Sequence, residues 1–246
     1  MTNDDGIYSL GIYSLWEVAK EFGEVVIVAP DSQKSAVGHS ITISKPLFIK
    51  DVVRENGFEG FSISGSPADC VKIGIKKIFD VRPDLILSGV NLGSNLGNNI
   101  IYSGTIAGAM EGAMQNIPSI AFSLDAFEFE NFKTLKIVIR KIIKLAIENK
   151  IFRKNLWNIN IPNCTSEELK GFKVTDQGSQ YFDDNFDSRI DPKGNKYFWM
   201  TGKMIDNDKN FNSDSFAIKN NFASITPIGF HLSKRKEIQK IKDILT

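Results

Sequence analysis

Mostly apolar runs alternate with amphipathic helical patterns through about residue 160, and this alternation limits the fold more than any other feature. The apolar runs lie at residues 25–30, 84–90, 119–124 and 157–162. Such runs are typical of strands that are covered on both faces of a sheet. Apolar residues at helical spacing separate them, at residues 7–22, 67–79, 104–114 and 129–149. The pattern predicts an α/β fold with a doubly wound, mostly parallel, Rossmann-like sheet.

Two parts of the chain depart from this alternation. Residues 41–53, broken at Pro46, and residues 58–63 predict a β-hairpin arm. Beyond about residue 164 we expect strands at residues 172–176, 197–201 and 222–227, then a short amphipathic helix. An acidic run lacks the spacing of a calcium-binding hand and predicts an exposed loop; it comprises Asp183, Asp184, Asp187 and Asp191. We expect one domain, with a core at about residues 1–163 and a C-terminal oligomerisation extension at about residues 164–246.

Composition narrows the class of protein. A chain of 246 residues, 42% hydrophobic, fits one large domain with a real core. Its formal net charge of +1 argues against binding to long nucleic acid or to an anionic membrane surface. Cys70 and Cys164 lack metal-site spacing and suit a reducing compartment. No apolar run approaches the ~20 residues of a membrane span, and the N-terminus lacks a secretory signal pattern. We therefore expect a soluble, cytoplasmic protein.

Adjacent carboxylates at the start of the chain are the first candidate functional feature. Asp4 and Asp5 directly precede Gly6 and a helical pattern. Two acids this close are costly unless a cation lies between them, and their hard oxygen atoms suit magnesium, manganese or calcium. The other interpretation is that one of them caps the following helix. The local sequence leaves both interpretations open.

Polar loops further along the chain supply possible partners for these acids. Residues 91–99 follow an apolar strand, and their glycines and asparagines, including Asn91 and Asn95, can present amides to an anion. Ser103, Gly104 and Thr105 open a helix, where free N–H groups favour a phosphate, although Ser103 also suits a plain N-cap. Ligands of doubly wound sheets bind at the carboxyl ends of the strands. These loops, residues 35–39 and the two acids should therefore meet at one edge.

The chemistry that this combination favours is metal-assisted hydrolysis of a phosphomonoester, with Asp4 and Asp5 as candidate catalytic residues. With His39 and His231 as the chain's two histidines and no Gly-x-Ser-x-Gly elbow, a nucleophilic triad is disfavoured. Two alternatives remain. One is an aspartyl-phosphate phosphatase, although such enzymes typically carry Asp-x-Asp. The other is a metal-gated nucleotide sensor without turnover.

An ordered set of motifs resembles the SurE family of stationary-phase survival proteins, which are metal-dependent nucleotidases. The matching stretches are Thr-Asn-Asp-Asp-Gly-Ile at 2–7, Ala-Pro-Asp at 29–31, Ser-Ala-Val-Gly-His-Ser-Ile-Thr-Ile at 35–43, Gly-Ser-Pro-Ala-Asp-Cys-Val at 65–71, Ser-Gly-Val-Asn-Leu-Gly at 88–93, Tyr-Ser-Gly-Thr at 102–105 and Ser-Ile-Thr-Pro at 224–227. Each motif alone is weak, but their order along nearly the whole chain is specific.

The resemblance implies one divalent cation per subunit, Mg²⁺ or Mn²⁺, held by Asp4, Asp5, Ser35 and Asn91. Phosphate would lie at Ser103, Gly104 and Thr105, beside the amides of Asn91 and Asn95. The implied substrates are nucleoside 5′- and 3′-monophosphates and, in some members, short polyphosphate. The resemblance also implies a homodimer or homotetramer that exchanges C-terminal segments.

One departure from the family pattern concerns the first strand. Family members carry a few apolar residues ahead of the Thr-Asn-Asp-Asp-Gly motif, whereas Met1 alone precedes Thr2 here. Either the start lies further upstream or the strand is short. Because each large buried side chain contributes about 1.5–3 kcal/mol, we expect an added apolar stretch upstream to raise thermal stability and activity.

Overall fold

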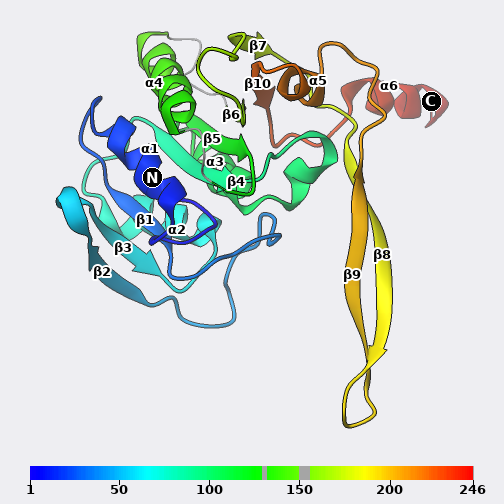
Figure 1. Cartoon of the computed structure of the whole chain (residues 1–246), viewed down its shortest axis with the longest axis horizontal. Helices are drawn as coiled ribbons and strands as arrows, with labels where there is room; N and C mark the ends of the chain where they lie inside the picture. The colour runs from blue at the N-terminus through cyan, green and yellow to red at the C-terminus, as the bar shows by residue number, and fades with distance from the viewer. Residues whose placement is uncertain (129–131, 150–155, 246) are drawn as a thin grey trace.

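A computed structural model describes residues 1–128, 132–149 and 156–245, and it has the doubly wound architecture that the sequence predicts (Figure 1). Helices and strands alternate as far as β6, after which two strands and a long hairpin follow. The elements are α1 (Leu10–Ala19), β1 (Ile27–Pro30), β2 (Ile49–Val53), η1 (Glu55–Gly57), β3 (Glu59–Ile63), α2 (Pro67–Ile73), η2 (Gly74–Ile78), β4 (Ile86–Leu92), η3 (Gly97–Tyr102), α3 (Gly104–Met114), β5 (Ser119–Asp125), α4 (Phe132–Glu148), β6 (Leu156–Pro162), β7 (Phe172–Val174), β8 (Tyr181–Ile190), β9 (Lys196–Ile205), α5 (Asp214–Lys219), β10 (Ala223–Ile228) and α6 (Arg235–Leu245).

The central layer consists of two hydrogen-bonded sheets, and the first residues of the chain lie between them and join them. One sheet has the strand order β1-β3-β2 and the other has the order β4-β5-β6-β10-β7. Between them, the N–H of Thr2 donates to the oxygen of Leu87 (3.0 Å), and the N–H of Val28 donates to the oxygen of Met1 (2.9 Å). Met1 and Thr2 therefore occupy the place of a short central strand. Asp4 and Asp5 follow directly at its carboxyl end.

Helices cover both faces of this sheet. The largest buried cluster joins β4, β5 and β6 to α1 and α4 on one face, with Leu15, Phe122 and Ile139 among its fully buried members. On the other face α2 packs on α3 and on β1. The predicted start of α4 at residues 129–131 lies outside the described residues. None of the helices in the described ranges is both long and apolar enough to cross a membrane.

Local signals explain where the helices near the site begin. Ser66, Pro67 and Asp69 form the capping box that their sequence predicts at the start of α2. The N-cap of α1 is Ser9, whose side chain accepts from the N–H of Ile12. The helix-capping interpretation of Asp4 and Asp5 is therefore wrong, because a turn separates both acids from α1.

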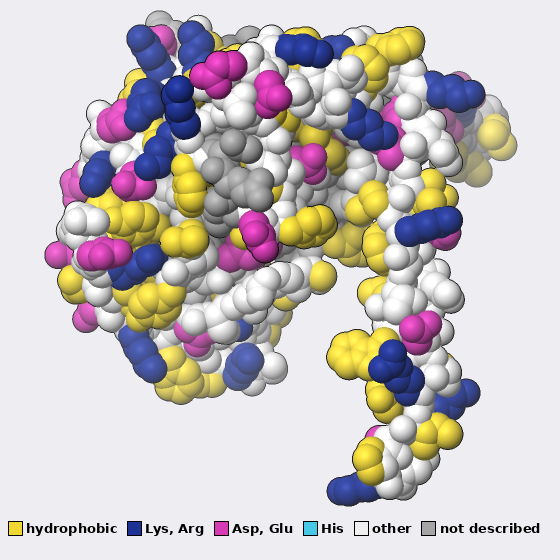
Figure 2. All heavy atoms as spheres, viewed as in Figure 1, with side chains coloured by type: hydrophobic (Ala, Val, Ile, Leu, Met, Phe, Trp, Pro, Cys, Tyr) yellow, Lys and Arg dark blue, Asp and Glu magenta, His cyan; other side chains and the backbone are white. Residues whose placement is uncertain are grey.

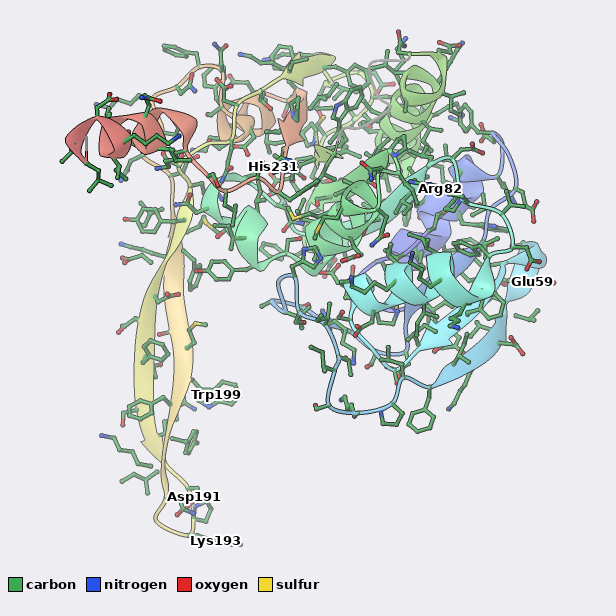
Figure 3. All side chains as sticks on the ribbon, turned by 180° about the vertical axis from the view of Figure 1, so that it is seen from behind. Glu59, Arg82, Asp191, Lys193, Trp199 and His231 are labelled. Atoms are coloured by element: carbon green, nitrogen blue, oxygen red, sulfur yellow. The ribbon has the colours of Figure 1, made fainter. Side chains whose placement is uncertain are left out.

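The C-terminal third contributes to the sheet and also leaves it. Strand β10 lies between β6 and β7 and is antiparallel to β6, so the core of the sheet extends beyond residue 163. Between β7 and β10 the chain forms the β8–β9 hairpin, which projects from the body of the molecule (Figure 1). The predicted acidic loop is wrong in its conformation, because Asp183, Asp184 and Asp187 belong to β8. Asp191 lies at the hairpin tip (Figure 3).

Candidate active site

A tight turn after the central strand presents the two aspartates. The buried side chain of Asn3 donates to the oxygen of Gly6 (3.0 Å) and to the hydroxyl of Ser9 (2.8 Å). Gly6 has φ of 93°, a conformation that glycine adopts without strain. The turn is therefore fixed at both ends, and it directs Asp4 and Asp5 to the carboxyl edge of the sheet. The sequence reasoning missed Asn3, although a polar residue next to a buried strand is a usable signal.

Asp4 lies against the N-terminus of α3. The hydroxyl of Thr105 donates to Asp4 Oδ1, and the N–H of Lys34 donates to the backbone oxygen of Asp4 (2.6 Å). A Cβ added to Gly104 would lie 2.8 Å from Asp4 Cβ, so a side chain larger than glycine's would not fit. Burial raises the pKa of Asp4 and outweighs the opposing hydrogen bond from Thr105. The residues predicted for the metal and for the phosphate thus meet here.

Asp5 faces the amide-rich loop. Burial, together with the neighbouring charge of Asp4, raises the pKa of Asp5 to about 6, against the effect of a hydrogen bond from the backbone of Leu92. That bond puts Asp5 beside Asn91, where the ladder of β4 and β5 shifts register between Ser88 and Asn91. The side-chain amide of Asn91 donates through Nδ2 to the oxygen of Gly93 (2.7 Å), which leaves Oδ1 as its atom for a cation.

Ser35 lies one residue from the backbone contact between Lys34 and Asp4. Its side chain is exposed, and its hydroxyl accepts from Gln33 Nε2 (2.8 Å). The loop at residues 31–44 therefore brings Ser35 to the side of the sheet edge where Asp4 lies. The structure gives no direct contact between Ser35 and either carboxylate.

Two predicted phosphate residues already have partners within the protein. The hydroxyl of Ser103 accepts from the N–H of Ile106 (3.1 Å), as the N-cap interpretation expects. Asn95 is buried, and its side chain donates to the hydroxyl of Ser123 (2.8 Å). Its backbone N–H donates to Asn160 Oδ1 (2.7 Å). These contacts make Asn95 part of a buried polar network behind the loop.

A further residue that the sequence patterns did not reveal binds the amide-rich loop at residues 91–99. Asp214, fully buried at the start of α5, accepts from the N–H groups of Gly97 and Gly178, each at 3.0 Å. Burial raises its pKa despite these hydrogen bonds. Asp214 therefore fastens the amide-rich loop to the root of the hairpin. In the sequence, the only local sign of this role is that Ser213 and Asp214 stand at the start of a helix.

The charge balance of the site suits a cation. Burial raises the pKa of both Asp4 and Asp5, and the charge of Asp4 also raises the pKa of Asp5. None of the ion pairs among the described residues involves either carboxylate. The described residues contain no group of three His, Cys, Asp or Glu side chains that could hold a metal ion. A metal here would accordingly need the oxygen atoms of Ser35 and Asn91 as well. Hard oxygen donors of this kind fit Mg²⁺ or Mn²⁺.

These features define a doubly wound α/β protein with an acidic site at the carboxyl edge of its sheet. A family model described as "Survival protein SurE" matches residues 1–184. The "5'-nucleotidase SurE" of Flavobacterium psychrophilum is 40% identical over 245 residues, covering 99% of this chain and 95% of the relative. The protein of that name from Thermosipho africanus is 39% identical, covering 99% and 95%.

A solved structure agrees with these sequence relatives. The SurE protein from Aquifex aeolicus superposes with a TM-score of 0.84 at 39% identity, covering 100% of this chain and 98% of that one. The chain belongs to the SurE family.

Proposed function

We propose that this protein is a divalent-metal-dependent phosphomonoester hydrolase acting on nucleoside 5′- and 3′-monophosphates and on short polyphosphate. The observation that carries the proposal is the pair Asp4 and Asp5, which share a turn and have no ion-pair partner among the described residues. Asp4 lies against the N-terminus of α3, and Asp5 accepts from the backbone of Leu92. The name that the relatives carry, 5'-nucleotidase, supports the choice of substrate.

The roles of the residues follow from their contacts. Asp4, Asp5, Ser35 and Asn91 would hold one Mg²⁺ or Mn²⁺ per subunit through oxygen atoms. A cation bound there supplies charge for the phosphoryl oxygens and acidity for the attacking water. Thr105 keeps Asp4 in place through its hydroxyl. The N–H of Gly104 and the dipole at the start of α3 would bind the phosphate, since the N–H of Thr105 donates to Asp4 and the hydroxyl of Ser103 serves as the cap.

Phosphate release from a panel of nucleoside 5′- and 3′-monophosphates tests the proposal, with Mg²⁺, with Mn²⁺ and with a chelator. We expect steady turnover that requires the metal and that Asp5→Asn abolishes. A stoichiometric burst of covalent phosphoenzyme would instead identify an aspartyl-phosphate phosphatase. Nucleotide binding without turnover would identify a sensor.

We also propose that the protein is a homodimer or homotetramer that pairs through its C-terminal segments. An isolated two-stranded hairpin is marginally stable in water, yet β8 and β9 are paired over ten residues each and carry many exposed apolar side chains. Figure 2 shows these side chains along the projecting hairpin, and Trp199 lies midway along it in Figure 3. Among the exposed residues are Phe186, Phe198, Trp199 and Met200.

Light scattering on a size-exclusion column tests this assembly. We expect a dimer or tetramer for the wild type and a smaller species for the double variant Phe198→Lys and Trp199→Lys. The control is Phe127→Lys, because Phe127 is 94% exposed and follows β5, outside the hairpin. A monomeric wild type would contradict the assembly.

A further inference from the structure

Glu111 is a buried carboxylate on α3, two turns beyond the residues at the start of that helix. The residue is 1% exposed, and its two oxygen atoms contact three side chains. Oε1 accepts from Lys72 Nζ (2.8 Å) and from Gln115 Nε2 (3.2 Å), and Oε2 lies 3.1 Å from His39 Nε2. Burial alone would raise the pKa of Glu111, but the hydrogen bonds from His39, Lys72 and Gln115 together lower it below its usual value. The carboxylate is thus charged, and it links separate elements.

One of these elements is the loop at residues 31–44, which carries Ser35. Its anchor before Ser35 is the N–H of Lys34, bound to the backbone of Asp4 (2.6 Å). The anchors nearest to Ser35 on its other side are the N–H of Gly38, which donates to the oxygen of Tyr102 (3.0 Å), and the side chain of His39 on Glu111. Further along, the start of α2 holds the loop at the oxygen of Ser40 and the N–H of Thr42. In the same segment, Ala36 and Gly38 have left-handed φ values of 55° and 54°. A left-handed conformation at a residue with a side chain persists where neighbouring contacts hold it.

The contact between His39 and Glu111 therefore constrains the loop that carries Ser35. It fixes the far end of a sharp turn whose near end is fixed on Asp4, and Ser35 lies between these two points. The side chain of His39 is 28% exposed, whereas that of Glu111 is 2% exposed. Glu111 is thus the buried partner of the pair, and His39 is the more exposed one.

We infer that Glu111, acting through His39, is a positioning residue that holds Ser35 at the cation site beside the start of α3. This inference rests on the proposed function, in which Ser35 is a ligand. Residues that orient a metal ligand typically change metal affinity about 10–100-fold when they are removed. The same carboxylate offers an internal control, because Lys72 binds Glu111 from α2 and, among the described residues, forms no ion pair with the loop.

The test is Mn²⁺ binding to four full-length proteins: wild type, His39→Ala, His39→Gln and Lys72→Met. We expect His39→Ala to bind Mn²⁺ about tenfold more weakly and to lose kcat/KM by a similar factor. His39→Gln, which keeps an N–H donor for Glu111, should restore most of both. Lys72→Met should lower the melting temperature and leave the Mn²⁺ affinity unchanged.

Three outcomes would overturn the inference. In the first, His39→Ala binds Mn²⁺ as tightly as the wild type. In the second, Lys72→Met weakens binding as much as His39→Ala does, which would make the effect one of general stability. In the third, the wild type binds no Mn²⁺ and has no metal-dependent turnover, and the proposed function then fails with the inference. Metal-dependent turnover in the wild type with an unaffected His39→Ala would reject the positioning role alone.

Discussion

Replacing Asp5 by asparagine should abolish turnover and yet stabilise the metal-free protein. Burial and the charge of Asp4 raise the pKa of Asp5 from 3.8 to about 6, whereas the unfolded chain keeps the ordinary value. Between these two pKa values the folded protein binds more protons than the unfolded chain, so stability falls as the pH rises. Above about pH 6 the full penalty of the ionised carboxylate is present. Asparagine has nearly the same shape and never carries this charge.

The magnitude follows from the change in pKa. A rise from 3.8 to about 6 corresponds to about 3 kcal/mol of preference for the neutral form. Asp5 is half-buried, so solvent screens part of this energy, and about 1–2 kcal/mol is a realistic penalty. For a chain of this length each kcal/mol shifts the melting temperature by about 2–4 °C. The melting temperature of metal-free Asp5→Asn should therefore exceed that of metal-free wild type by about 2–8 °C near neutral pH.

Calorimetry in the presence of a chelator, at about pH 5 and about pH 7.5, measures this difference. We expect the stabilisation to be largest at the higher pH and to shrink at the lower one, where wild-type Asp5 is mostly protonated. Asp51→Asn, at an exposed position in β2, is the matched control and should change little. A metal-free Asp5→Asn that melts below the wild type, or a gain that is equal at both pH values, would refute the reasoning.

Three further substitutions and one control substitution test the contacts around the site. Gly104→Ala places a Cβ 2.8 Å from Asp4 Cβ and should lower kcat/KM about 10²-fold. Gly112→Ala, which meets Ile86 and Ser119 instead, should lower the melting temperature with kcat/KM retained; equal kinetic losses would contradict this. Thr105→Val removes the donor to Asp4 and should weaken Mn²⁺ binding about tenfold in a titration, whereas unchanged affinity would deny Thr105 its orienting role. Asp214→Ala leaves the N–H groups of Gly97 and Gly178 unpaired and should cost about 2–4 kcal/mol in urea unfolding; a loss below 1 kcal/mol would count against it.

The sequence was sufficient for the parts of the fold that follow from local pattern. Continuous apolar runs predict β1, β4, β5 and β6, and their carboxyl ends must share an edge in a parallel sheet. Because Asp5 also stands at the start of a helical pattern, the same rule predicts that it lies near Asn91, and the hydrogen bond from the backbone of Leu92 to Asp5 agrees with this. The capping box at Ser66 was equally predictable, since its three residues act within one turn.

Features that depend on distant partners were not predictable. Aspartate is disfavoured in strands and the acidic run predicts a loop, yet Asp183, Asp184 and Asp187 lie in β8 and pair with β9. The roles of similar amides also depend on where each side chain points. Asn91 adjoins Leu92, whose backbone donates to Asp5, whereas the side chain of Asn95 points inward and donates to Ser123. Spacing along the chain does not reveal which way each side chain points after a register shift.

The most direct test of the central claim is anomalous X-ray scattering from crystals of the wild-type protein grown with Mn²⁺. The account predicts one strong peak per chain, bounded by the carboxylates of Asp4 and Asp5 and by Oδ1 of Asn91, with the Ser35 hydroxyl facing it. A peak elsewhere on the molecule, or a site at which Asp5 and Asn91 do not share the ion, would contradict it.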